Sequence, residues 1–137
     1  MSFKYSICHP DKPNIEYPKN TLNASAVKEM VHSYPWKEAL KKMHALPKDA
    51  VYYSPSLDFT NLNNNYTFCL SAVGEDLENF TFYIFYNRKI KKKILFGLLG
   101  EKEDFYWIDK SFSREAGHSL LDHFLSGNYQ QMEKLMQ

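Results

Sequence analysis

The first part of the chain alternates apolar and polar positions and then changes to helical spacing. Phe3, Tyr5 and Ile7 alternate with polar residues, and this period of two predicts a half-buried strand over residues 3–8. Farther on, apolar residues recur at spacings of three and four in two stretches separated by Pro35, which a helix tolerates only near its beginning. The predicted helices span residues 24–33 and 36–46.

The middle of the chain has the pattern of a sheet. Residues 66–72 alternate strictly, whereas residues 80–86 are apolar or aromatic at nearly every position, which is typical of a central strand covered on both faces. We expect a tight connection within residues 87–89, a partner strand running through Leu99, and a last strand at residues 105–108. Shorter strand signals lie at residues 51–53 and 57–59, before an asparagine-rich turn at 61–65.

Helical spacing returns near the C-terminus. Serines that can cap a helix, followed by apolar residues at the spacing of one buried helix face, predict a helix over residues 113–126. Gly127 separates it from a second predicted helix over residues 128–136. Strands and helices do not alternate along the chain, so a parallel sheet is not expected. We predict one α+β domain over residues 1–137. Its antiparallel meander of about five to six strands occupies residues 50–109 plus the strand near 3–8, with the helices packed on one face.

Charge and composition narrow the classes of partner. The 137 residues include 17 lysines and arginines against 16 aspartates and glutamates, so the net charge of +1 provides no global attraction for nucleic acid. The first ten residues lack the apolar stretch of a signal peptide, and the run Ile94–Leu99 is far shorter than a membrane span. We therefore expect a cytoplasmic protein with neither a membrane nor a nucleic-acid partner.

The sequence has no recognisable catalytic or metal-binding motif. Cys8 and Cys69 are separated by 61 positions with no CxxC pair, which favours two reduced thiols over a disulfide framework or a zinc site. His118 and Asp122 share one face of a predicted helix, a spacing found on helix surfaces as well as in metal sites, but the segment is not HExxH. We predict no catalytic residues, no metal and no cofactor.

Five of the six residues from Arg88 to Lys93 are cationic. At a hairpin, such a run can bind a protein partner with an acidic patch, or it can protect an exposed strand edge from aggregation. The acidic residues at 101, 103 and 104 would neutralise part of it. The candidate binding residues are Arg88, Lys89, Lys91 and Lys93, with Tyr86 as an aromatic anchor beside them.

Aromatic residues make up 16% of the chain, more than a core of this size needs. This surplus supports an alternative function, a small-ligand-binding or hydrolytic domain with an aromatic-lined pocket between the sheet and the helices. The candidate pocket residues are Tyr52, Tyr83, Tyr86 and Trp107.

The pair of short helices, the antiparallel sheet and the closing segment Ser111–Leu125 resemble the small bacterial immunity proteins that neutralise toxins. The resemblance implies a protein-binding role. Together with the cationic run, it leads us to predict a non-catalytic cytosolic protein-binding module, with the ligand-binding or hydrolytic domain as the alternative.

Overall fold

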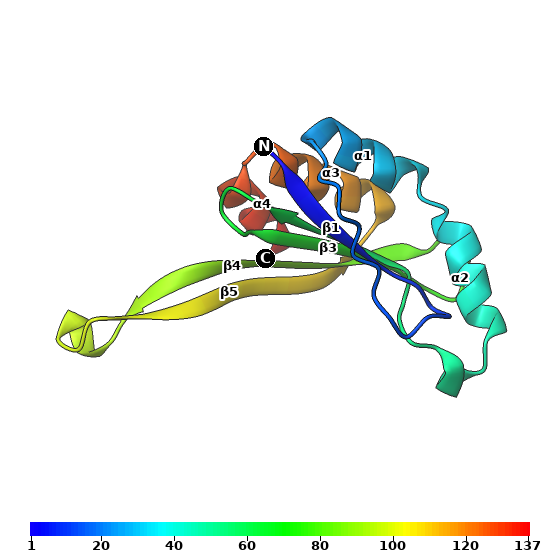
Figure 1. The fold of residues 1–137 in the computed structure, drawn as a ribbon, viewed down its shortest axis with the longest axis horizontal. Coiled ribbons are helices and arrows are strands. Elements are labelled where there is room, and N and C mark those ends of the chain that lie inside the picture. The colour runs from blue at the N-terminus through cyan, green and yellow to red at the C-terminus, as the bar shows by residue number, and fades with distance from the viewer.

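Five antiparallel strands follow one another across the sheet in the order in which they occur in the chain. The structure, a computed structural model, describes all 137 residues. The strands are β1 (Phe3–Cys8), β2 (Ser56–Asn61), β3 (Thr67–Val73), β4 (Thr81–Lys93) and β5 (Glu101–Phe112). The helices are α1 (Ala24–Ser33), α2 (Trp36–Ala45), α3 (Arg114–Leu125) and α4 (Tyr129–Met136), with short 3₁₀ turns η1 (Lys48–Ala50) and η2 (Leu95–Gly97). Figure 1 shows the helices on one face of the sheet, which confirms the predicted α+β class.

The helices begin and end where local side chains require it. The Asn23 side chain accepts a hydrogen bond of 2.8 Å from the Ala26 backbone N–H at the start of α1, and Ser113 caps α3 in the same way. Pro35 separates α1 from α2, because a proline cannot continue the preceding helix. The four predicted helices are therefore confirmed to within two residues at each end.

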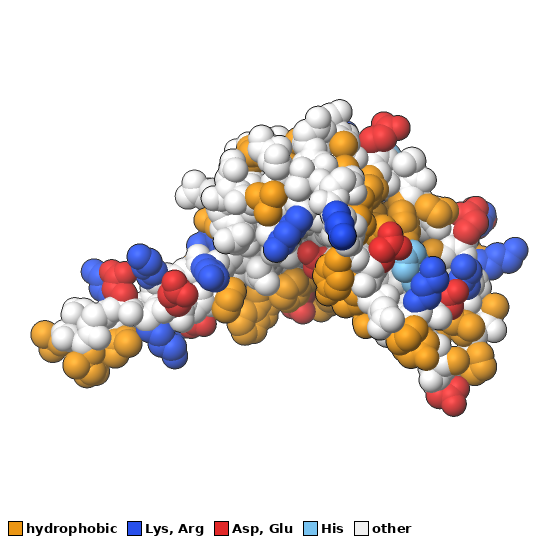
Figure 2. Space-filling view, in the orientation of Figure 1, with side chains coloured by type: hydrophobic (Ala, Val, Ile, Leu, Met, Phe, Trp, Pro, Cys, Tyr) orange, Lys and Arg blue, Asp and Glu red, His pale blue; other side chains and the backbone are white.

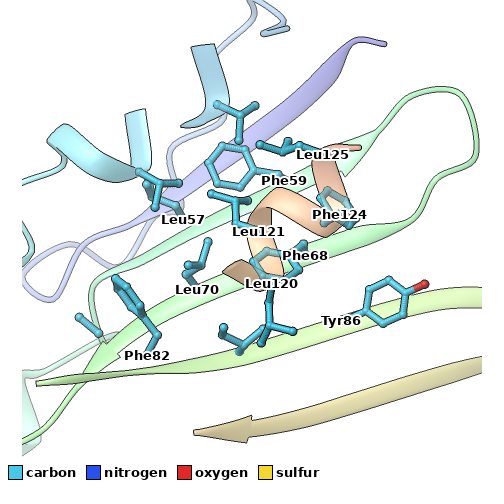
Figure 3. Close-up of a cluster of buried hydrophobic side chains, with 14 of the residues drawn as sticks. Leu57, Phe59, Phe68, Leu70, Phe82, Tyr86, Leu120, Leu121, Phe124 and Leu125 are labelled. Carbon is cyan, nitrogen blue, oxygen red and sulfur yellow. The ribbon is translucent and has the colours of Figure 1, made fainter. Parts of the chain in front are cut away.

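The core lies between the sheet and the helices that cover it (Figure 3). Phe124 of α3 is completely buried, with its ring centroid 5.2 Å from that of Phe68 on β3 and 6.4 Å from that of Tyr86 on β4. Alternate residues of β4, Phe82 and Ile84, are buried in the same layer. Burying such side chains contributes about 1.5 to 3 kcal/mol each to folding, which makes this layer the main source of stability.

The prediction that residues 80–86 form a strand covered on both faces is wrong. The β4 side chains alternate between the helix-covered face and an open face, where Tyr83 keeps 39% of its surface exposed. The continuous aromatic run therefore places apolar side chains on an uncovered face.

The predicted tight connection at residues 87–89 is also wrong, because β4 continues to Lys93 and pairs with β5 along its whole length. The chain turns at residues 94–100, where Gly97 and Gly100 adopt φ values of 90° and 85°. Residues 87–89 contain no glycine for such a turn. Residues 51–53, expected to form a strand, lie in the loop before β2.

The two edges of the sheet differ. The outer edge of β1 is occupied by two isolated backbone bridges, Phe3 with Leu22 and Ile7 with Glu16. The outer edge of β5 has no neighbouring strand over 12 residues. No helix is both long and apolar enough to pass through a lipid bilayer.

The close approach of α3 to β4 predicts the effect of a glycine substitution. A Cβ atom at Gly117 would lie 2.9 Å from Cδ2 of the buried Phe82 ring and 3.4 Å from Cδ1 of Ile84. We expect Gly117→Ala to destabilise the fold by about 1 kcal/mol, because overpacking of about 1 to 3 kcal/mol exceeds the helix-propensity gain of nearly 1 kcal/mol. Urea unfolding measures the change, with Ser119→Ala on the exposed side of α3 as the control. A Gly117→Ala variant as stable as the native chain would contradict this packing.

Candidate functional site

The end of the β4–β5 hairpin projects from the rest of the molecule (Figure 1). The pairing between β3 and β4 ends where Thr67 meets Asn87, so beyond this point β4 and β5 pair with no strand except each other. We call residues 88–106, from Arg88 to its cross-strand partner Tyr106, the arm. A two-stranded hairpin without a covering layer is only marginally stable by itself, so the arm needs an anchor on the body.

The Glu133 carboxylate on α4 provides this anchor. It accepts hydrogen bonds from the Tyr86 hydroxyl at 2.8 Å and from Nε and Nη2 of Arg88 at 2.8 and 3.1 Å. The Arg88 guanidinium also lies over the Tyr106 ring, 4.8 Å from its centroid. Burial, with Glu133 nearby, raises the pKa of the Tyr86 hydroxyl, so this group remains a donor.

Two of the predicted partner-binding residues therefore have structural roles. Tyr86 is completely buried under the helices, so its ring cannot serve as an exposed anchor for a partner without displacing α4. Arg88 is held by Glu133 and Tyr106. The sequence pattern did not reveal this role, because Glu133 is 45 positions away from Arg88.

The three predicted lysines are exposed on the arm. Lys89, Lys91 and Lys93 alternate along β4 and share its open face. Across the hairpin, Lys91 lies opposite Glu103 and Lys93 lies opposite Glu101. These acidic residues are therefore placed to neutralise part of the positive charge of the lysines. On the other face, Lys92 forms an ion pair of 2.8 Å with Asp104. The arm contains six cationic and three acidic residues, so it has a local charge of +3 although the whole chain carries only +1.

The end of the arm is apolar and has no cover, a feature that we call the tip, residues 94–100. Four large side chains of the tip are more than half exposed, and Figure 2 shows hydrophobic side chains at the end of the arm, with charged ones between them and the body. The exposed fractions are 59% for Leu95, 99% for Phe96, 84% for Leu98 and 67% for Leu99. The sequence prediction missed the tip because it assigned this segment to a strand running through Leu99, whereas β4 ends at Lys93.

The tip backbone is strained. Leu95 and Phe96 have φ values of 48° and 57°, the left-handed region that residues with a Cβ rarely occupy. Each such residue costs about 1 to 2 kcal/mol, and strain of this kind is concentrated at functional sites. Backbone hydrogen bonds, including Ile94 N–H to the Gly100 carbonyl at 3.0 Å, close the tip despite this cost.

The four candidate pocket residues do not meet. Tyr83 and Tyr86 point to opposite faces of β4, and the Tyr83 hydroxyl donates to Asp109 on the open face at 2.8 Å. Trp107 is 59% exposed on that open face, and Tyr52 lies in the loop before β2, with its N–H bonded to the Pro10 carbonyl. The layer between sheet and helices, where the pocket was predicted, is filled by core side chains.

The histidine, aspartate and cysteine residues considered in the sequence analysis do not form a common site either. His118 stacks on His32 of α1 with ring centroids 4.1 Å apart, and burial, with His32 adding to it, lowers the pKa of His118. Asp122 instead pairs with Lys28 at 3.2 Å. Both cysteines are free thiols, and burial raises the pKa of Cys69 to about 12, so its nucleophilic thiolate is suppressed near neutral pH.

None of the protein-family models, curated proteins and solved structures compared with this chain matches it.

The anchor at the base of the arm predicts a stability effect. We expect Glu133→Gln to lower the free energy of unfolding by about 1 to 3 kcal/mol, because it removes the charge that balances the half-buried Arg88. Tyr86→Phe should cost less, about 1 kcal/mol, since Arg88 keeps its partner. Chemical denaturation measures both, and Glu115→Gln, an exposed change on α3, should stay within about 0.5 kcal/mol of the native chain. Equal stability of Glu133→Gln and Glu115→Gln would refute the anchor.

Proposed function

We propose that this chain is a non-catalytic, cytosolic protein-binding module that binds its partner through the arm. The observation that carries the proposal is the tip, where Leu95, Phe96, Leu98 and Leu99 are exposed on a segment that projects beyond the core. Large apolar groups gathered at one exposed point mark interaction surfaces in soluble proteins. The strained backbone of Leu95 and Phe96 gives a second, independent reason to assign the tip a function.

The tip provides the binding energy in this proposal. A fully buried leucine or phenylalanine side chain gains about 1.5 to 3 kcal/mol, and four of them exceed the smaller estimates of what association costs. A convex tip of this kind needs a concave partner surface. We therefore infer a partner with an apolar pocket that receives the Phe96 ring and the neighbouring leucines.

The cationic part of the arm selects the partner by charge. Lys89 faces Phe105 rather than an acidic residue, so its charge is not compensated across the hairpin. With a local charge of +3, the arm is complementary to a pocket with an acidic rim. Charges at the rim act mainly on the association rate, whereas buried apolar groups determine how long a complex lasts.

A first prediction concerns the apolar tip. The double variant Phe96→Ser/Leu98→Ser should lose capture of the partner from the cytosol of the source cell, because the buried contact is removed while the core is untouched. The matched control is Tyr52→Ser/Leu62→Ser, which removes two exposed apolar side chains outside the arm. Quantitative mass spectrometry of the captured proteins compares the two variants with the native chain.

The expected result is one protein that is captured by the native chain and by the control variant but not by the tip variant. Capture by all three alike would contradict a role of the tip. Anionic phospholipid vesicles provide the competing outcome, because an apolar tip flanked by lysines also has the composition of a membrane anchor. Tip-dependent sedimentation with vesicles, without protein capture, would replace the protein partner by a lipid surface.

A second prediction concerns the lysines. Replacing Lys89, Lys91 and Lys93 by serine should slow association with the captured partner about tenfold at low ionic strength. The midpoint of thermal unfolding should hardly change, because all three side chains are exposed. The control variant replaces Lys12, Lys19 and Lys41, which are exposed elsewhere, and alters the net charge equally. Unchanged association kinetics for the arm variant would leave edge protection as the role of these lysines.

A further inference from the structure

A second candidate site lies on the open face of the sheet, away from the arm. There, β1, β2 and β3 present a hollow of about 360 Å³, which the segment between β1 and α1 walls with Ile15 and Tyr17. Two backbone hydrogen bonds of 2.9 Å between Ile7 and Glu16 hold this segment against β1. We call this hollow the open-face pocket.

A row of three side chains crosses the floor of the open-face pocket. Ser6 on β1 pairs in register with Asp58 on β2, which in turn pairs with Cys69 on β3. Asp58 is the only carboxylate among the lining residues. Its side chain is only partly accessible, so an ionised carboxylate there has lost much of its hydration.

The hydroxyl pairs beside this row are already hydrogen-bonded, whereas Asp58 is not. Ser56 and Ser71 lie 2.6 Å apart through their hydroxyl oxygens, and Thr60 and Thr67 lie 3.3 Å apart. The Asp58 side chain forms no hydrogen bond or ion pair within the chain, and the charge of Lys4 acts on its pKa from a greater distance. The Asp58 oxygens are not sealed in the core, so the carboxylate is open to the pocket and free to accept hydrogen bonds from a bound molecule.

We propose that the open-face pocket binds a small primary amine with a short apolar tail, whose ammonium group pairs with the Asp58 carboxylate. The ammonium supplies the hydrogen-bond donors that Asp58 lacks within the chain, and the Ser6 hydroxyl adds an acceptor in the same row. The tail contacts Ile15 and Tyr17 on the wall. The volume equals that of roughly twelve water molecules, which suits a ligand of about ten heavy atoms or fewer.

The charges around the pocket limit the ligand to a single positive group. Lys4 lines the same hollow and repels any ammonium group there, and Asp58 is the one carboxylate that can offset this repulsion, so the second charge of a diamine would have no partner. The titratable side chains that share the open face with Asp58 are Lys4 and Cys8 on β1, Tyr17 on the wall and Cys69 on β3. The Tyr5 side chain lies on the helix-covered face, where its ring stacks on that of the buried Phe59. Burial raises the pKa of Cys69 to about 12 and also that of Cys8, so neither thiol competes with Asp58 as an anion at neutral pH.

The pH response follows from the same surroundings. Burial raises the pKa of Asp58 from 3.8 to about 6, with Lys4 opposing the change. At pH 7.5 the carboxyl is ionised and can hold an ammonium group. At pH 5 about nine-tenths of the groups are protonated, so binding should be about tenfold weaker.

The test uses n-butylamine, which is a cation at neutral pH, as the probe of the full chain, followed by two-dimensional ¹H–¹⁵N NMR. At pH 7.5 we expect saturable shifts of the Ser6, Asp58 and Cys69 amides, and no saturable shifts with n-butanol, the neutral analogue of similar size. Asp58→Asn should weaken binding at least tenfold. Lys4→Gln should strengthen n-butylamine binding about twofold or more, since this substitution removes a positive charge that repels the ammonium group. A merely structural role of Asp58 would not produce this gain in affinity.

Several results would overturn the proposal. They are equal shifts with n-butylamine and n-butanol, equal affinity at pH 5 and pH 7.5, or shifts that Asp58→Asn leaves unchanged. If Asp58→Asn does not fold, the Lys4→Gln variant and the alcohol control decide the question. The outcome is independent of the arm, because the arm contributes no residue to the open-face pocket.

Discussion

The rest of the structure depends on how β4 passes from the body into the arm. Over its first half, alternate side chains of β4 are buried beneath α3, and at its midpoint the Glu133 carboxylate of α4 accepts hydrogen bonds from both Tyr86 and Arg88. Tyr86 is the last β4 residue in the core, and Arg88 is the first of the arm. One carboxylate therefore joins the core to a hairpin that has no core of its own, so the tip can be apolar and strained without weakening the layer that folds the chain.

The sequence was sufficient to predict those elements whose ends are determined by side chains close to them in the chain. Asn23, Pro35 and Ser113 act on their own helices, and the helices begin and end where these residues predict. The sheet was harder, because apolar residues were assumed to be covered. The run at residues 80–86 is aromatic on both faces of β4, but the helices cover only one of them. Periodicity cannot tell a doubly buried strand from one whose second face is exposed, since tertiary packing decides this.

Only part of the candidate site was predictable from the sequence. The lysines were recognised as exposed, but the turn was placed seven residues too early and the apolar tip was taken for a strand. A signal was present: Lys91, Lys92 and Lys93 precede ILFGLLG, and an acidic segment beginning at Glu101 follows it. Opposite charges on either side of a short segment with two glycines are typical of a hairpin whose strands pair by charge. The structural role of Arg88 was not predictable, because its partner Glu133 lies in another element.

The most direct test of the account is amide hydrogen exchange of the chain, free and bound to the captured partner. In the free chain, the amides of residues 81–87 should exchange slowly, because this part of β4 carries side chains that are buried in the core. The amides of the arm should exchange quickly, because the arm has no core. On binding, protection should rise mainly in residues 88–106. A rise confined to the helices or to β1–β3, with the arm still exchanging as in the free chain, would contradict the claim that the arm is the binding site.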